Sequence, residues 1–180
     1  RDYSLYLKKP KNKLSNSDKE KIISALRNVA VNDKFWRVRR GILSEVGIIF
    51  TPQGQNQANV AVNFDDATAA AFLKATKDES SQARADAIAF LGNTRDVKYE
   101  NVYLEGLNDK SNRVNGESAL ALAKAKSPKA FDALVKMVNT DSWHQNSRIQ
   151  GLQGLAELGD KRALDVGLKY ANDKNQPAQV

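Results

Sequence analysis

A helical pattern recurs along this chain at intervals of about thirty residues, and a repeat of this kind restricts the possible fold more than any other feature of the sequence. Five apolar helical patterns each follow a residue suited to cap a helix, and the intervals between these caps are 49, 30, 31 and 33 residues. The last three intervals are nearly equal. The five capping residues are Ser17, Asp66, Asp96, Ser127 and Asp160.

The residues at these positions have the chemistry of helix starts. Ser17 and Glu20 form a capping-box pattern, in which each side chain pairs with a free backbone amide of the first turn. Pro128 suits the first position of a helix because its φ angle is fixed and it has no N–H to satisfy. Asp96 and Asp160 can accept hydrogen bonds from first-turn amides and complement the helix dipole.

Each cap precedes apolar residues spaced three and four apart, which is typical of a helix that buries one face. A second helix is predicted to follow in the first four units, because an acidic residue recurs ahead of an arginine. These pairs are Asp33 with Arg37-Val38, Asp109 with Arg113-Val114, Asp141 with Arg148-Ile149 and, as a weaker match, Asp78 with Arg84-Ala85. Gly47, Gly92 and Gly159 are predicted to end three of the second helices, since glycine adopts the left-handed conformation most readily.

The predicted fold class is therefore all-α, an α-α superhelix of about four to five helical hairpins. Residues 1–16 are interpreted as a basic linker and residues 17–180 as the repeat domain. The predicted units are 17–50, 66–95, 96–126, 127–159 and an incomplete 160–180, with an inserted loop at 51–65. In the third unit, Asn115-Gly116 is expected to delay the start of the second helix.

Two segments give this repeat a family resemblance. The run from Asp109 to Leu122 and the run from Leu155 to Leu164 resemble HEAT repeats, in which paired antiparallel helices stack into a superhelix. The resemblance covers roughly residues 17–180. It implies a HEAT-like fold and a role in packing or binding.

A narrower resemblance involves two further segments. Residues Asp33 to Arg39, together with Asp141 to Ile149, are similar to the HEAT-like C-terminal region of aminopeptidase N-like zinc metallopeptidases, the gluzincin aminopeptidases. In that family the helical region follows the catalytic domain and helps to shape its cavity. The family's His-Glu-x-x-His and Gly-x-Met-Glu-Asn motifs do not occur in this sequence. The resemblance thus implies a non-catalytic part of a metallopeptidase, whose zinc would lie in an upstream domain.

The sequence itself offers no catalytic, metal or cofactor site. It contains no cysteine and a single histidine, His144, so the usual ligands of zinc are missing. Asp65 and Asp66 are adjacent carboxylates that point apart, and Asp66 is better used as a helix cap. The acidic residue and arginine pairs recur in several units, which indicates a structural role in capping helices and joining neighbouring units.

Two tryptophans lie near the predicted starts of second helices. Trp36 and Trp143 either fill corners between helices or act as exposed anchors for a partner. The first interpretation is preferred. The second is the alternative, and it draws on the arginines beside Trp36, because tryptophan and arginine are enriched at binding hot spots. The candidate interaction surface comprises Trp36, Arg37, Arg39, Arg40 and Trp143.

Positive charge gathers at the start of the chain. Residues 1–50 hold 12 Lys and Arg against 5 Asp and Glu, whereas residues 51–180 hold 16 against 16, so the first segment carries the whole net charge of +7. This excess is suited to nucleic acid or an acidic partner. It is equally consistent with a solvated linker at Lys8, Lys9, Lys11 and Lys13.

The leading hypothesis is a non-catalytic interaction module that packs against an upstream domain of its own chain or against a protein partner. Nucleic-acid binding and a free-standing protein scaffold are the alternatives. No apolar run approaches the roughly 20 residues that span a bilayer, and nothing in the sequence indicates a compartment.

The last predicted helix, Leu164 to Ala171, lacks a partner helix within the sequence. By the spacing of earlier units, its partner would start near Gln179. We therefore expect Leu164 and Leu168 to pack inward on the preceding unit, residues 173–180 to be poorly anchored, and the natural chain to continue past Val180.

Overall fold

The computed structural model describes residues 14–51, 61–140, 142 and 145–171 of the 180-residue chain. Every regular element within these ranges is a helix, which confirms the predicted all-α class. The elements are α2 (Asn16–Asn32), α3 (Trp36–Phe50), α4 (Asp66–Ala75), α5 (Ser81–Gly92), the 3-10 helix η2 (Val97–Tyr99), α6 (Glu100–Gly106), α7 (Asn112–Lys124), α8 (Ala130–Val138), α9 (Asn146–Leu158) and α10 (Ala163–Ala171).

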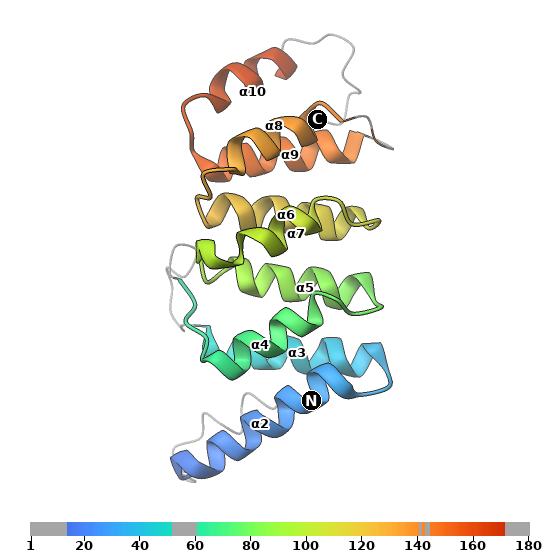
Figure 1. Ribbon diagram of the computed structural model, residues 1–180, viewed down its shortest axis with the longest axis vertical. Helices are drawn as coiled ribbons and strands as arrows, with labels where there is room; N and C mark the ends of the chain where they lie inside the picture. The colour runs from blue at the N-terminus through green and yellow to red at the C-terminus, as the bar shows by residue number, and fades with distance from the viewer. Residues whose placement is uncertain (1–13, 52–60, 141, 143–144, 172–180) are drawn as a thin grey trace.

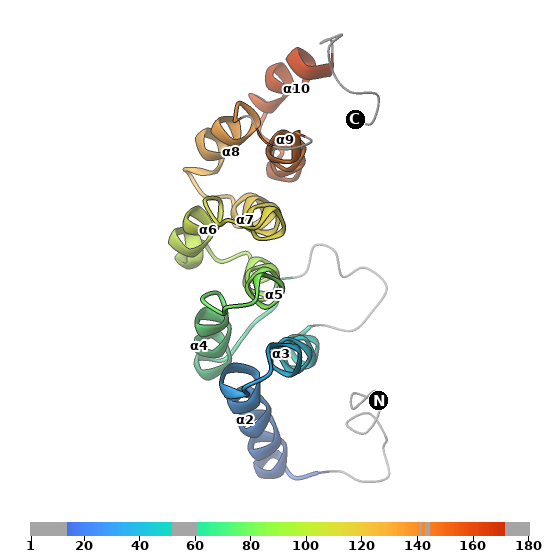
Figure 2. The ribbon, with the colours of Figure 1, turned by 90° about the vertical axis from the view of Figure 1, so that its right-hand side faces the viewer.

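These helices form four hairpins that stack along one axis: α2 with α3, α4 with α5, α6 with α7, and α8 with α9 (Figure 1). The first helices of the hairpins form one layer and the second helices form the other (Figure 2). The stack bows so that α3, α5, α7 and α9 line its inner side. Helix α10 follows as a single helix, so the architecture is the predicted superhelix of helical hairpins.

The core runs between the two layers because each hairpin contributes apolar residues at equivalent positions. One position of the second helices is occupied by Val46, Leu91, Leu122 and Leu155, all of which are at most 2% exposed. The first helices contribute Ala30, Phe72, Tyr103 and Leu134, all at most 1% exposed. Each second helix is thus buried against its own hairpin and against its neighbours in the stack.

Two helix starts differ from the prediction by one or two residues. The cap of α2 is Ser15 rather than Ser17, because the Ser15 hydroxyl accepts from the Asp18 amide and donates to the Asp18 carboxylate. The cap of α4 is Asp65 rather than Asp66, since Asp65 accepts from the Thr68 amide at 2.7 Å. In both cases a neighbouring residue of the same chemistry takes the position whose side chain points back at the first turn.

Of the other three predicted caps, Asp96 caps the 3-10 helix η2 that leads into α6, whereas Ser127 and Asp160 act one step earlier than expected, in the turn before the first helix. Each side chain accepts a hydrogen bond from the amide two residues further on, as in Asx and Ser/Thr turns. The bonds join Asp96 to Lys98 at 2.9 Å, Ser127 to Lys129 at 3.0 Å and Asp160 to Arg162 at 2.9 Å. Pro128 consequently lies in a turn rather than at the first helical position, since α8 begins at Ala130.

The expected loop at 51–65 contains no helix in its described residues. At its end, Phe64 stacks on Phe72 at 4.8 Å and meets the edge of Phe50 at 5.7 Å between ring centroids. The Val62 amide donates to the Asn93 carbonyl at 2.8 Å. These contacts fix the point at which the chain re-enters the stack.

Two glycines show how closely neighbouring units approach. A Cβ atom on Gly92, at the end of α5, would lie 2.6 Å from the Ala121 Cβ and 2.9 Å from its Cα in α7. A Cβ atom on Gly41, in the exposed part of α3, would meet no atom within 4 Å. The packing therefore requires glycine at position 92 and does not require it at position 41.

We expect the same substitution to have opposite effects at these two glycines. Gly92→Ala should lower the free energy of unfolding by about 1–3 kcal/mol, because the backbone of α7 has to move away. Gly41→Ala should raise it by about 0.5–1 kcal/mol, because alanine loses less backbone entropy in a helix. Urea unfolding followed by circular dichroism measures both, and equal effects of the two variants would contradict this account of the stack.

Candidate interaction surfaces

The turns between the two helices of a hairpin are connected by a line of polar side chains. Arg39, Arg84 and Asn115 each occupy the fourth position of α3, α5 and α7, respectively. Each donates to a carbonyl of the turn that precedes its own helix. The bonds run from Arg39 to Asp33 at 2.7 Å, from Arg84 to Asp78 at 2.8 Å and from Asn115 to Asp109 at 2.8 Å.

The two arginines also reach forward to the carboxylate of the next turn. Arg39 binds Asp78 with two hydrogen bonds of 2.6 and 2.9 Å, and Arg84 binds Asp109 with two of 2.8 Å. These pairs are well shielded, since the side chains of Arg84 and Asp109 are 9% and 17% exposed. We call Arg39, Asp78, Arg84 and Asp109 the arginine ladder.

The ladder changes the acidity of its members. Hydrogen bonds from Arg84 hold the pKa of Asp109 below its ordinary value. Burial opposes ionisation of Asp78, but hydrogen bonds from Arg39 and from the Ser80 amide outweigh it and lower the pKa of that carboxyl. All four groups are therefore charged near neutral pH, and each charge is compensated by its partner.

The ladder contains one predicted pair, Asp78 with Arg84, and corrects another, because Asp33 pairs with Arg39 rather than with Arg37. The arginine that serves its own turn lies six residues after the aspartate, as in Asp33 with Arg39 and Asp78 with Arg84. Arg37 instead lies exposed, and Arg113 reaches back to Asp86 at 3.1 Å. Arg148 takes the equivalent position in α9, where its Nε donates to the Val138 carbonyl at 3.4 Å.

Asn115 is a second correction. It does not delay the second helix of its unit, since α7 begins at Asn112. Its side-chain amide donates to the carbonyls of Gly106, Leu107 and Asp109 and replaces an arginine at this position. The asparagine thus stabilises the turn within its own unit.

The predicted surface residues separate into an exposed group and a buried one. Trp36 is partly exposed, and the Arg37 guanidinium lies 5.3 Å from the centre of its ring. Arg40 is bound to Asp86 at 2.6 Å and to Gln82 at 2.9 Å. Arg39 is wrongly included in that surface, because it is only 8% exposed and belongs to the ladder. Trp143 lies outside the described residues.

The sequence interpretation overlooked Phe35, which precedes Trp36. Its side chain is 59% exposed, and the Lys34 ammonium group lies 4.8 Å from its ring. The run Lys34-Phe35-Trp36-Arg37, in which two adjacent aromatic residues are flanked by basic ones, was the available signal. We call Phe35, Trp36, Arg37 and Arg40 the α3 edge. Beside it, Trp36, Arg37 and Arg40 line an open hollow of about 560 Å³ that extends to Gly41, Ser44, Glu45 and Gln82.

A second surface lies at the far end of the stack, between α9 and α10. Leu164 and Leu168 are 65% and 49% exposed, so the prediction that they pack inward is wrong. Helix α10 is turned so that Ala163, Val166 and Tyr170 face the stack instead. The Tyr170 hydroxyl donates to Asn139 at 2.6 Å and anchors α10 to the end of α8.

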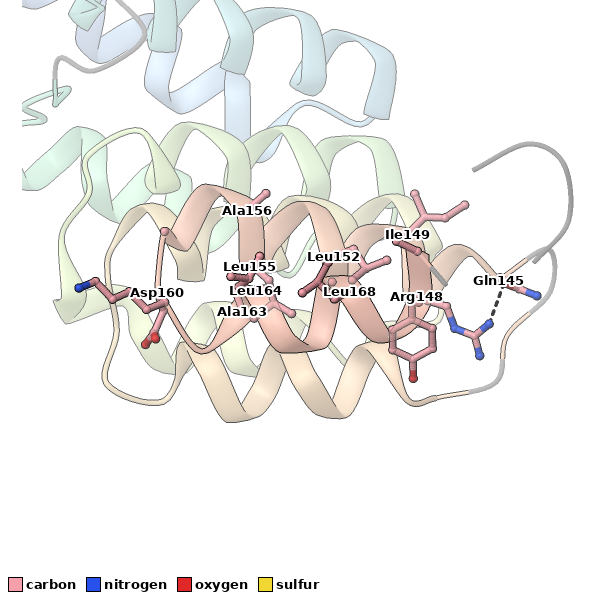
Figure 3. Close-up of a pocket in the computed structure, with 15 residues that line it drawn as sticks. Gln145, Arg148, Ile149, Leu152, Leu155, Ala156, Asp160, Ala163, Leu164 and Leu168 are labelled. Atoms are coloured by element: carbon pink, nitrogen blue, oxygen red, sulfur yellow. Dashed lines mark hydrogen bonds between the residues drawn. The ribbon is translucent and has the colours of Figure 1, made fainter. Parts of the chain in front are cut away.

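The residues between α9 and α10 form an apolar groove of about 750 Å³. In Figure 3 the side chains of Leu152, Leu164 and Leu168 gather in its middle, with Arg148 at one end and Asp160 at the other. We call this the terminal groove. The expectation for residues 173–180 falls outside the described residues.

Comparison with known proteins identifies the repeat. Residues 69–146 match HEAT repeats. The chain contains HEAT-like repeats. Among solved structures, an X-ray structure of Escherichia coli YibA is similar, with 19% sequence identity and a TM-score of 0.45 over 89% of this chain and 67% of that chain. The comparison with curated proteins finds no match.

The HEAT-like units described here hold no recognisable metal centre. Within residues 14–51, 61–140, 142 and 145–171, no three His, Cys, Asp or Glu side chains lie where they could hold a metal ion. Asp65 binds Arg27 at 2.7 Å and caps α4, whereas Asp66 is exposed in the first turn. His144 lies outside the described residues. None of the described helices is long and apolar enough to cross a bilayer.

We expect Arg84→Met to lower the free energy of unfolding by about 3 kcal/mol at pH 7, because it leaves the shielded Asp109 carboxylate without its partner. The lowered pKa of Asp109 means that its contribution is complete above the ordinary carboxyl pKa of about 3.9 and is lost as pH falls through the folded-state value. The difference between wild type and Arg84→Met should therefore narrow in acid.

Urea unfolding at pH 7 and at pH 3 measures this difference. Lys77→Met is a matched control, since Lys77 pairs with Glu105 in a largely exposed position and should contribute little at either pH. A difference between wild type and Arg84→Met that is as large at pH 3 as at pH 7 would contradict the role assigned to the ladder.

Proposed function

We propose that this HEAT-like chain is a non-catalytic scaffold that binds a protein partner through the α3 edge. The observation that carries the proposal is the exposure of two adjacent aromatic rings, Phe35 and Trp36, each with a cation of its own chain against it. Rings and guanidinium groups of this kind supply large contact areas and charged hydrogen bonds at hot spots. The rest of the HEAT-like stack holds this edge in place.

The charges of the α3 edge indicate what kind of partner it binds. Arg40 is already held by Asp86 and Gln82, so it supports the edge. Arg37 is exposed and forms no ion pair with the residues that the structure describes. A partner segment with an apolar side chain next to a carboxylate would cover Phe35 or Trp36 and pair with Arg37.

Two more specific hypotheses concern the identity of the partner. The resemblance of Asp33 to Arg39 to gluzincin aminopeptidases favours a catalytic domain packed on this edge, and it rests on the sequence alone. Nucleic-acid binding rests on the charge of residues 1–50. In the described part of that segment, Arg27, Arg39 and Arg40 are paired with acids, which leaves fewer cations for phosphates.

A peptide-display selection on the full chain tests the proposal. We expect the enriched peptides to combine acidic and large apolar residues, and to bind Phe35→Ala/Arg37→Glu at least tenfold more weakly in fluorescence anisotropy. Tenfold corresponds to about 1.4 kcal/mol, which is less than one hot-spot residue contributes. Lys19→Glu/Ile22→Ala, an equivalent pair of changes on the exposed side of α2, should leave the affinity unchanged.

Two results would contradict the proposal. The first is equal binding of the enriched peptides by wild type and Phe35→Ala/Arg37→Glu. The second is tight binding of duplex DNA that falls steeply between 50 and 200 mM salt and is weakened by that same variant, because phosphate contacts release counterions in this way. The second result would support the nucleic-acid hypothesis instead.

A further inference from the structure

Helix α9 is the second helix of the last hairpin, and unlike α3, α5 and α7 it has no later second helix packed against it among the described residues. Helix α3 is packed against α5, α5 against α7, and α7 against α9, so each second helix is followed by another that continues the inner layer (Figure 2). Among the described residues no second helix follows α9. The terminal groove therefore lies where the next helix of the inner layer would pack.

The lining of the terminal groove is that of a helix–helix interface. Leu152 and Leu155 of α9 continue the positions that Ala119 and Leu122 occupy in α7, and Leu122 is fully buried beneath the next hairpin. On the opposite wall, Leu164 and Leu168 are one helical turn apart and point into the groove (Figure 3). An apolar stripe of one amphipathic helix would cover both walls.

Arg148 supplies the polar end of the terminal groove. In α9 it takes the position that Arg39 has in α3 and Arg84 has in α5. Arg39 and Arg84 each bind an aspartate in the turn before the second helix of the next hairpin, Asp78 and Asp109 respectively. The Arg148 guanidinium instead donates to Gln145 at 2.8 Å and lies 4.8 Å from the centre of the Tyr170 ring. No carboxylate of the described residues forms an ion pair with it. The described residues therefore provide no carboxylate for Arg148 that would correspond to Asp78 for Arg39 or Asp109 for Arg84.

We propose that the terminal groove binds an amphipathic helix of a partner protein, with an acidic residue just before its first turn. The bound helix runs parallel to α9, as α7 and α9 run parallel to each other. Its apolar stripe covers Leu152, Leu164 and Leu168, and its acidic residue pairs with Arg148. This interface is separate from the α3 edge, which lies at the other end of the stack (Figure 1).

One other occupant fits the groove less well. A second copy of the chain would present the same concave face, and two hollow faces do not fill each other. A helix from a partner supplies both the convex apolar face and the acid.

A peptide of residues 109–124 is a suitable probe, because it contains Asp109 and α7, the segment that makes the equivalent contact with Arg84. We expect the labelled peptide to bind the full chain saturably in fluorescence anisotropy. Leu168→Asp in the chain should weaken the binding at least tenfold. Val97→Asp is the matched control, since Val97 and Leu168 are both 49% exposed, and it should leave the affinity unchanged.

The charge contact is tested by combining two changes. Arg148→Gln in the chain and Asp109→Asn in the peptide should each weaken binding, and the two together should weaken it no more than either alone. Additive effects would show that Arg148 does not bind the acidic residue and would overturn that part of the proposal.

Three results would overturn the docking site itself: no saturable binding, equal binding by Leu168→Asp, or self-association of the chain in sedimentation that Leu168→Asp abolishes. The last result would assign the groove to a second copy. The Phe35→Ala/Arg37→Glu variant should bind this peptide as wild type does. The proposal for the terminal groove and the proposal for the α3 edge can therefore be tested independently.

Discussion

The packing of each second helix between its neighbours is the constraint on which the rest of this structure depends. Val46, Leu91, Leu122 and Leu155 are buried because a helix of the next or the previous unit covers them. Since a repeat array makes contacts only between neighbours, each unit is as stable as the interfaces on its two sides. The ends show the effect: α10 has no buried residue, and α2 has only Arg27 and Ala30.

The arginine ladder adds register to this packing. Apolar surfaces tolerate sliding, whereas a guanidinium group that binds two turns at once does so in a single alignment of the units. Arg84 illustrates this, because it binds the carbonyl of Asp78 in its own unit and the carboxylate of Asp109 in the next. Two carboxylates of the ladder, Asp78 and Asp109, are 31 residues apart, which is the length of one repeat.

The sequence was sufficient for the helices and for their order, because periodic apolar residues report burial directly. It was less informative about individual polar residues. Arg37 and Arg39 lie two apart on one helix, and only the packed stack shows that Arg39 faces inward and Arg37 outward. Leu164 and Leu168 were assigned to the core for their apolarity, but which face of α10 turns inward depends on contacts of Arg162 with Phe131 and of Tyr170 with Asn139. Such contacts between distant residues have no signature in local spacing.

The re-entry point at Phe64 has a consequence for how this architecture tolerates change in length. Phe72 stacks on its ring, Phe50 makes a T-shaped contact with it, and the Val62 amide donates to the Asn93 carbonyl, so the chain is fixed to the stack on the far side of the segment between Thr51 and Ala61. Each doubling of the length of a connection between two fixed ends adds only about 0.6 kcal/mol to the entropic cost of closing it. The junction between the first two units is therefore a site where evolution can add new sequence, or a whole inserted domain, without rebuilding the helices around it.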